Sequence, residues 1–261
     1  MLKLYPLFSG SSGNMYYITS PKSKIILDFG VSYKKAVSAL QSIGENIEDV
    51  DAICITHEHS DHISGLKTML KKHNIPLFST AKTLEYILDK YELEYTNTIT
   101  IDYDKPFKIQ DITISPFKVS HDAVNPVGYT FIHEDSTLTV ATDLGYIDEN
   151  VYTHLNQSNF SVIEANYDPQ LLMYGPYPYN TKLRIKSDIG HLSNIDTSDV
   201  ILELAKCGKR NFLLGHISLN NNDEIYALNT VTSKLETNGF DLNEFNIHVA
   251  TRDFSDEVYL L

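Results

Sequence analysis

Residues 56–62 read THEHSDH, and this stretch constrains the fold and the function more than any other part of the chain. It follows the apolar run 52–55 and precedes a helical pattern that begins at Ser64, which predicts a strand-to-helix turn. In a turn, residues at i, i+2, i+4 and i+5 can converge, whereas on a helix residues i and i+2 face different directions. Imidazole and carboxylate groups bind divalent Zn, Mn and Fe. The alternative is a solvated turn without a metal, but such a turn would rarely contain three of the ten histidines of the chain. The stretch therefore predicts metal ligands at His57, His59, Asp61 and His62.

Three further residues of ligand type stand directly after apolar strands. His121 ends the run SPFKVSH, Asp143 ends TLTVATD, and His216 ends NFLLGH. Singly, each could be a cap, a turn residue or a surface histidine. Because the same placement recurs three times, we expect the three side chains to meet at one sheet edge. Seven ligands suffice for two metal ions: His57, His59 and His121 for one, Asp61, His62 and His216 for the other, and Asp143 as the bridge.

Asp28 closes the apolar run KIILD and is followed by Phe29 and Gly30. Histidines that bind metals usually donate their second ring N–H to a nearby acceptor. Asp28 is therefore predicted to orient the histidine-rich turn, with an ordinary N-cap or turn aspartate as the alternative.

Short β-rich runs alternate with longer helical patterns, which predicts a mixed α/β chain. Several strands follow one another between Lys105 and Thr142 with only turns between them, so part of the sheet structure is predicted to be antiparallel. No repeat or linker divides the chain, which predicts a single domain over residues 1–261. The predicted strands are 24–28, 52–56, 76–79, 113–118, 128–133, 137–142, 161–164, 211–215, 246–250 and 258–260; the predicted helices are 33–43, 64–73, 82–91, 148–156, 199–207 and 223–238.

Residues 167–193 are irregular and rich in Tyr and Pro, which is typical of a lid or binding loop, although a packed surface loop is also consistent with the pattern. Lys182 and Arg184 in this segment would supply local positive charge to a substrate, unless they belong to a solvated strand. His191 at its end is a candidate general acid, because an imidazole titrates near neutral pH. A capping or packing role is the alternative for His191.

A small-residue turn near the N-terminus offers a second candidate contact to substrate. Ser11, Ser12 and Asn14 belong to the segment FSGSSGN, whose backbone N–H groups could face a phosphate. A plain turn explains the same residues almost as well.

The composition describes a folded, acidic chain. Of 261 residues, 42% are apolar and 21% are charged, which excludes a disordered chain. The 34 acidic and 21 basic residues give a net charge of −13, which argues against sequence-independent coating of DNA but not against one local cationic site. Two cysteines cannot build a disulfide framework. No apolar run approaches the roughly 18 residues of a membrane span, and no signal-peptide core is present, so we expect a cytoplasmic protein without membrane contact.

The order of these motifs resembles the metallo-β-lactamase-fold superfamily. The matching residues are Asp28, the run His57-x-His59-x-Asp61-His62, then His121, Asp143 and His216. The narrower YycJ (or WalJ) branch of this superfamily is resembled in residues 8–14, 175–193 and 215–222. Two positions differ from that branch, which usually carries His where Tyr167 stands and consecutive basic residues where this chain has Lys182-Leu183-Arg184. The resemblance implies an α/β fold, an αββα four-layer sandwich of two mixed sheets with a dinuclear site at one edge. It also implies a metal-dependent, exonuclease-like phosphodiesterase related in chemistry to ribonuclease Z.

The leading hypothesis is hydrolysis of phosphodiester bonds at nucleic-acid ends by a metal-bridging hydroxide. Two metals about 3.5–4 Å apart can generate such a nucleophile at neutral pH. Either Asp61 or Asp143 would then handle the proton of the nucleophile, and His191 would handle that of the leaving group. One alternative is hydrolysis of a small thioester, lactone or cyclic phosphodiester; another is a metal-binding regulatory module without turnover. The two metal ions could be Zn, Mn or Fe, because mixed His/Asp sites accept all three.

Overall fold

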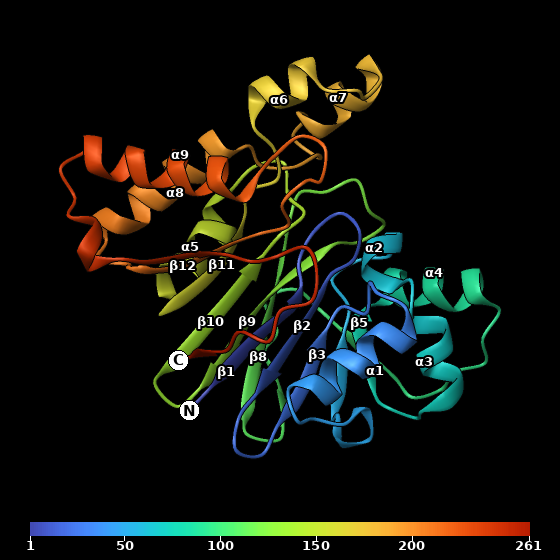
Figure 1. The fold of residues 1–261 in the computed structure, drawn as a ribbon. Helices are drawn as coiled ribbons and strands as arrows, with labels where there is room; N and C mark the ends of the chain where they lie inside the picture. The colour runs from blue at the N-terminus through green and yellow to red at the C-terminus, as the bar shows by residue number, and fades with distance from the viewer.

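Two seven-stranded mixed sheets pack against each other at the centre of the computed structural model, which describes residues 1–261 (Figure 1). The first sheet has the order β14-β1-β2-β3-β4-β5-β6, and the second has the order β13-β12-β11-β10-β9-β8-β7. The strands of the first sheet are β1 (Lys3–Phe8), β2 (Met15–Thr19), β3 (Lys24–Leu27), β4 (Ala52–Cys54), β5 (Leu77–Thr80), β6 (Thr98–Ile101) and β14 (Tyr259–Leu260). Those of the second are β7 (Phe107–Ile109), β8 (Ile112–Lys118), β9 (Val127–His133), β10 (Ser136–Ala141), β11 (Phe160–Glu164), β12 (Asn211–Gly215) and β13 (Asn246–Val249).

Each sheet is half antiparallel and half parallel. Strands β14, β1, β2 and β3 pair antiparallel, and β3 to β6 pair parallel. The second sheet repeats this plan, with β7 to β10 antiparallel and β10 to β13 parallel. The antiparallel segment predicted between Lys105 and Thr142 is therefore confirmed.

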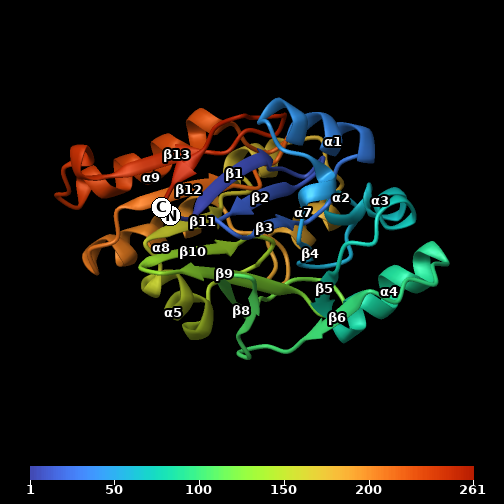
Figure 2. The same cartoon turned by 90° about the horizontal axis from the view of Figure 1, so that it is seen from below.

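Helices cover the outer face of each sheet (Figure 2). The first sheet packs against α1 (Tyr33–Ser42), α3 (Leu66–Lys72) and α4 (Ala81–Tyr91), with the short α2 (Ser60–Ile63) at its edge. The second packs against α5 (Glu149–Gln157), α8 (Asn194–Lys206) and α9 (Glu224–Thr237), and the chain also forms α6 (Pro169–Tyr174) and α7 (Tyr179–Ile185).

The strand sequences explain why the molecule has four layers. Strands buried on both faces are apolar at every position instead of at alternate ones. In β3, for example, Ile25 and Leu27 belong to the apolar core between the sheets, whereas Ile26 belongs to the core between the first sheet and its helices. A third core lies between the second sheet and its helices. The predicted αββα sandwich is confirmed.

Several local expectations were wrong. Strands β1, β2, β6 and β7 were not predicted; in β1, Pro6 and the register shift that follows it interrupt the strand pattern. The helix expected over residues 64–73 is α3 (Leu66–Lys72), but a separate short helix, α2, precedes it, so Asp61 and His62 lie on α2 and not in an open turn. Helix α8 begins at Asn194, five residues before the predicted start, because Ser193 and Asp196 form a capping box.

The segment 167–193 is not irregular, because it contains α6 and α7. Asp168 caps α6 by accepting hydrogen bonds from the backbone N–H groups of Gln170 and Leu171, and Pro169 occupies the first helical position. The abundance of Tyr and Pro in this segment predicted irregular structure, so these signals for the start of a helix were missed. None of the helices in the molecule is both long enough and apolar enough to cross a lipid bilayer.

Candidate metal centre

The candidate ligands lie on loops and on the short helix α2 at the carboxyl ends of the central strands, at the end of the molecule from which α6 and α7 extend (Figure 1). Asp28, Asp143 and His216 follow β3, β10 and β12, and all three adopt left-handed backbone angles, with φ of 61°, 58° and 54°. Residues other than glycine rarely adopt this conformation, and they do so most often where a functional geometry requires it. The three strands therefore end in the same way, with a sharp turn that carries a polar side chain.

The first donor set consists of His57, His59 and His121. One ring nitrogen of each lies within 4.8 Å of the others. His59 Nδ1 and His121 Nε2 are 3.2 Å apart, and the His57 ring stands edge-on to both neighbours. Three imidazoles that face one another at this distance form a pocket lined by nitrogen lone pairs.

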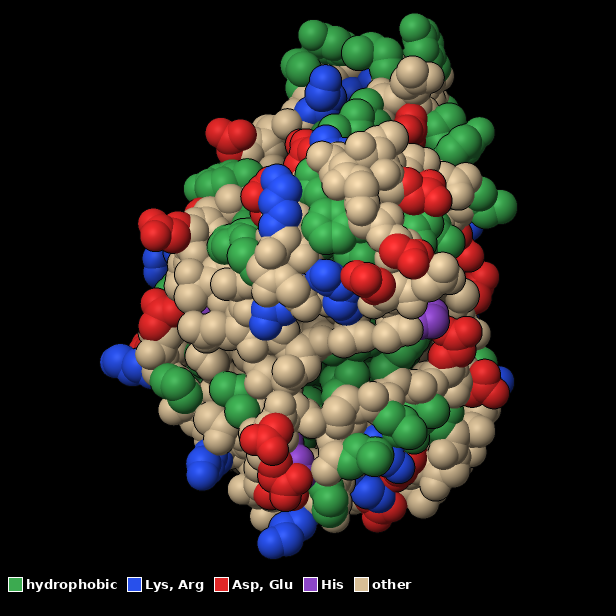
Figure 3. All heavy atoms as spheres, turned by 90° about the vertical axis from the view of Figure 1, so that its left-hand side faces the viewer, with side chains coloured by type: hydrophobic (Ala, Val, Ile, Leu, Met, Phe, Trp, Pro, Cys, Tyr) green, Lys and Arg blue, Asp and Glu red, His purple; other side chains and the backbone are tan.

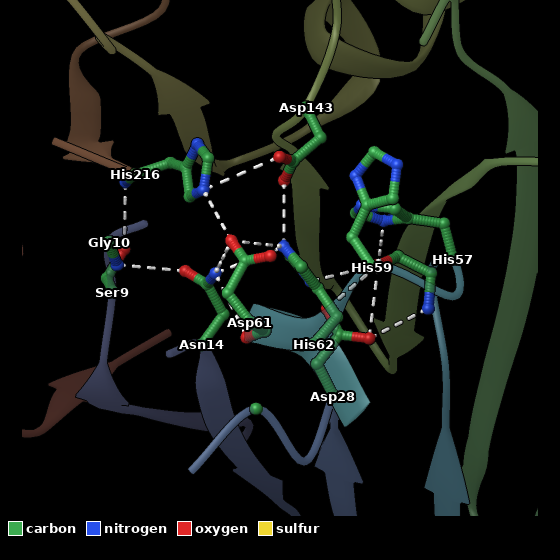
Figure 4. Close-up of polar contacts among 12 residues, drawn as sticks. Ser9, Gly10, Asn14, Asp28, His57, His59, Asp61, His62, Asp143 and His216 are labelled. Atoms are coloured by element: carbon green, nitrogen blue, oxygen red, sulfur yellow. Dashed lines mark hydrogen bonds and ion pairs between the residues drawn. The ribbon is translucent and has the colours of Figure 1, made fainter. Parts of the chain in front are cut away.

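The second donor set consists of Asp61, His62 and His216 (Figure 4). Asp61 Oδ2 lies 3.5 Å from His62 Nε2 and 3.4 Å from His216 Nε2. Asp143 joins this set, because its Oδ2 lies 3.4 Å from His62 Nε2 and its Oδ1 lies 3.4 Å from His216 Nε2. Asp143 also groups with His57, a member of the first set, so it is the residue between the two.

Two buried atoms show that these donors fit a cation. His57 Nε2 and Asp143 Oδ2 are buried and have no hydrogen-bond partner. A buried polar atom without a partner costs free energy unless some group satisfies it. His57 Nδ1 is paired with Thr56 Oγ1, so Nε2 is the free ring nitrogen, and His57 and Asp143 belong to one group of donors with His62. Imidazole and carboxylate are the donors that divalent transition metals accept. The residues present therefore fit divalent metal ions.

Outer contacts fix the orientation of two of these imidazoles. His62 Nδ1 donates to Asp28 Oδ2 over 2.7 Å, and His121 Nδ1 donates to Gly190 O over 3.0 Å. Because each partner only accepts, Nδ1 carries a proton and Nε2 is the ring atom that can face a metal. Asp28 also accepts the Thr56 backbone N–H over 2.8 Å. Asp28 thus contacts both Thr56 and His62 of the histidine-rich turn.

The absence of a side chain at Gly30 lets the loop after β3 pack closely against the histidine-rich turn. A Cβ at Gly30 would lie 1.6 Å from Asp61 O, so no other residue could occupy this position without a shift of the backbone. On the other side, the Asn14 backbone N–H donates to the same carbonyl over 2.8 Å. These contacts hold the start of α2 against the loop that follows β3.

Glu164 is a functional candidate that the sequence interpretation missed. It ends β11, is fully buried, and accepts hydrogen bonds from His216 Nδ1 over 2.8 Å and from His191 Nδ1 over 2.7 Å. Its other oxygen accepts the backbone N–H groups of Leu144 over 3.1 Å and Leu192 over 3.3 Å. The signal was available, because Glu164 closes an apolar strand as Asp143 does. Through Glu164, His191 is held beside the second donor set.

The two donor sets differ in their electrostatics. Burial lowers the pKa of His57 well below its usual value, and burial also lowers the pKa of His121. Burial acts in the same direction on His62 and His216, but the carboxylates around them, led by Asp143, raise the pKa of His62 well above its usual value and that of His216 to about 10. Metal binding to the second set must therefore release protons.

The residues predicted to contact substrate occupy different surroundings. Ser11 and Ser12 are exposed on the turn between β1 and β2. Asn14 is buried inside the site, where its Oδ1 accepts the Gly10 N–H over 2.9 Å and its Nδ2 lies 3.0 Å from His62 Nε2.

Lys182 and Arg184 are both engaged within the protein. Lys182 Nζ donates to Met173 O and to Gly175 O over 2.8 Å each. Arg184 forms a two-pronged ion pair with Asp122, whose Oδ1 lies 3.5 Å from His121 Nε2. Contact of either cation with substrate stays a prediction.

Comparison with known proteins agrees with this geometry. A model of the beta-lactamase superfamily domain matches residues 24–217. Exodeoxyribonuclease YycJ of Bacillus anthracis is 35% identical over 246 residues, which cover 93% of this chain and 92% of that protein. Exodeoxyribonuclease WalJ of Streptococcus pneumoniae is 37% identical over 232 residues, which cover 88% and 86%. The crystal structure of YhfI from Bacillus subtilis, a metallo-beta-lactamase fold protein, matches 100% of both chains with a TM-score of 0.72 at 16% identity. The chain therefore belongs to the beta-lactamase superfamily, in the branch of the YycJ and WalJ proteins.

Proposed function

We propose that this protein is a metal-dependent phosphodiesterase that removes nucleotides from nucleic-acid ends. The observation that carries this proposal is the pair of Glu164 and His191 beside the two donor sets, because it adds a positioned proton donor to a metal centre. The relatives named exodeoxyribonucleases, which align with nearly the whole chain, support the same activity.

Two divalent ions would be held by this chain. His57, His59 and His121 would bind one, Asp61, His62 and His216 would bind the other, and Asp143 would contact both. When bound, such ions polarise a phosphoryl oxygen and lower the pKa of water to about 7. Zn, Mn and Fe all suit these ligands.

His191 would act as the general acid. Its Nδ1–H is committed to Glu164, so Nε2 on the opposite side of the ring is the atom that can hold a proton for the leaving oxygen. The imidazole is only partly exposed, and its Nδ1 lies 3.9 Å from Asp143 Oδ1, close to the scissile bond of a substrate bound at the centre. Glu164 accepts the Nδ1–H and thereby fixes the orientation of the ring.

Asp61 would act on the attacking side. Its Oδ2 faces His62 and His216, and these two imidazoles lower the pKa of the carboxyl group despite its burial. An ionised carboxylate accepts hydrogen bonds only, so Asp61 can orient a nucleophile by accepting a hydrogen bond from it. A cytoplasmic location and a single domain over residues 1–261 remain our predictions from the sequence.

Metal depletion and restoration test the proposal. Protein stripped by a chelator should lose cleavage of end-labelled oligonucleotides and regain it with Mn²⁺ or Zn²⁺. The same preparations should be offered an acyl-thioester and a cyclic phosphodiester. Turnover of either small substrate, with no cleavage of any oligonucleotide under either metal, would contradict the proposal and favour the small-molecule alternative.

A further inference from the structure

Residues 169–190, called the arm below, form a projection that carries exposed apolar side chains. Its helices α6 and α7 extend beyond the helical layer of the second sheet (Figure 1). Tyr174 ends α6 and Tyr179 begins α7, and they are 88% and 71% exposed. Met173, Leu183 and Ile189 are also exposed. Large apolar side chains that gather on a surface mark an interaction site more often than single ones do.

The arm is braced, so these side chains are presented on a defined scaffold. Tyr167, Leu172 and Ile185 form a small buried cluster at its base. The bonds from Lys182 Nζ to Met173 O and Gly175 O tie α7 to the end of α6. Tyr177 accepts a hydrogen bond from Asn220 Nδ2 over 3.0 Å. The exposed tyrosines of the arm therefore belong to an ordered segment and not to an unstructured loop.

The base of the arm is continuous with the metal centre. Arg184 on α7 pairs with Asp122, the neighbour of His121, and Gly190 O accepts the Nδ1–H of His121. The chain then continues directly to His191. A polymer whose end lies at the metal centre would meet the arm as the adjoining surface.

The charge of the arm is opposite to that of the rest of the molecule. Lys182, Arg184 and Lys186 stand against a single acidic residue, Asp188, in a chain with 34 acidic and 21 basic residues. Hydrophobic and basic side chains gather at the end of the molecule where Figure 1 places the arm (Figure 3). The surface thus fits a partner that combines negative charge with flat apolar faces.

We propose that the arm binds unpaired nucleotides of single-stranded nucleic acid by stacking bases on Tyr174 and Tyr179, an inference that rests on the proposed function. Stacking on aromatic side chains beside a positive groove is how proteins hold single strands without sequence preference. Because Lys182 and Arg184 are already engaged, bases contribute more to this binding than phosphates do. In a duplex the internal bases are stacked on each other and only the terminal pair exposes a face, so a blunt duplex can use this surface much less than a single strand can.

Binding to the metal-loaded protein tests the inference without requiring turnover. The probe is a fluorescein-labelled oligo(dT) whose phosphorothioate linkages resist cleavage, compared with a blunt hairpin duplex by fluorescence anisotropy. Tyr174→Ala and Tyr179→Ala should each raise the Kd for the single strand roughly 5- to 100-fold, and the Phe variants should bind nearly as wild type does. Tyr86→Ala, which removes an exposed tyrosine from α4 away from the arm, is the matched control.

The outcomes separate the arm from the catalytic proposal. Unchanged single-strand affinity in the Tyr174→Ala/Tyr179→Ala double variant, or equal wild-type affinity for the blunt duplex, overturns the role of the arm whether or not the enzyme cleaves DNA. A wild-type dimer that the double variant converts to monomers would also overturn it, because the surface would then serve a second copy of the chain. Absence of all phosphodiesterase activity, with the tyrosine-dependent binding intact, would instead refute the proposed function alone.

Discussion

Replacing Glu164 by Gln is a small change in shape with a large expected effect. Glu164 receives four hydrogen bonds, from the imidazole Nδ1 atoms of His191 and His216 and from the backbone N–H groups of Leu144 and Leu192. All four partners are donors, and a carboxylate is an acceptor only. A glutamine side chain must turn its NH₂ group toward either the two histidines or the two backbone groups.

Each orientation has a different cost. If the NH₂ group faces Leu144 and Leu192, two buried N–H groups lose their acceptor, which costs about 1–3 kcal/mol for each group. If it faces the imidazoles, His216 must move its proton to Nε2, the atom that faces Asp61 and Asp143. Loss of such an outer contact typically lowers metal affinity about 10- to 100-fold. The variant must therefore lose stability, metal affinity or both.

Chelator competition measures the metal affinity, and urea unfolding of the metal-free protein measures the stability. Glu58→Gln is the matched control, because Glu58 is also buried but uses only Oε1, which accepts the Val124 N–H, while Oε2 has no partner. In Glu58→Gln the amide NH₂ can occupy the position of the unpartnered oxygen, so we expect little change in stability or metal affinity. Wild-type stability together with wild-type metal affinity in Glu164→Gln would refute the assignment of Glu164 as a shared acceptor.

Three further predictions concern the metals, the proton donor and pH. Asp143→Ala should lower the metal content found by elemental analysis below two ions per chain, since Asp143 approaches both donor sets; equal content in variant and wild type would contradict a shared ligand. His191→Ala should slow cleavage of a diester with a poor alkoxide leaving group about 10²–10⁴-fold and an activated aryl diester much less, and equal losses on both would assign it to phosphate binding. Burial lowers the pKa of His154, so the unfolded chain binds a proton at this residue more readily than the folded protein does. The stability advantage of wild type over His154→Gln should therefore shrink as the pH falls below about 6.5. A constant difference between pH 8 and pH 5 in unfolding experiments would show that His154 does not titrate differently on folding.

The strands that carry the site were predictable because burial on both faces makes them rich in apolar and β-branched residues. The runs that end at Asp28, Asp143 and His216 were each identified from this property, and each ends in a polar residue at the sheet edge. The outer strands lacked the same signal. In β6, Ile99 is exposed and the strand reads TITI, while β1 contains Pro6. Their place in the sheet depends on partners that are distant in sequence, which no local pattern encodes.

The site itself was predictable to the extent that its residues share one local placement. His121, Asp143 and His216 follow apolar strands, and the same rule applied to the run that ends at Glu164 would have identified the acceptor for His191. Asn14 was singled out for its backbone turn, but its side chain contacts Gly10 and lies beside His62. A pattern can indicate that a residue is near a site, but the contact that it makes depends on the packing of separate segments.

Charge shows most clearly why sequence alone could not assign substrate contacts. Lys182 and Arg184 are two cations in an acidic chain, and the sequence predicted that they supply local positive charge to a substrate. In the folded protein, the first satisfies the carbonyl groups at the end of α6, where a helix leaves acceptors without partners, and the second neutralises Asp122 beside the metal centre. Asp122 would otherwise add negative charge near the position where a phosphate has to bind, so the pairing favours an anionic substrate even if Arg184 never touches it. Substitution of Arg184 should therefore weaken binding of a small phosphodiester as well as that of an oligonucleotide, whereas loss of the tyrosines on the arm should affect the oligonucleotide far more.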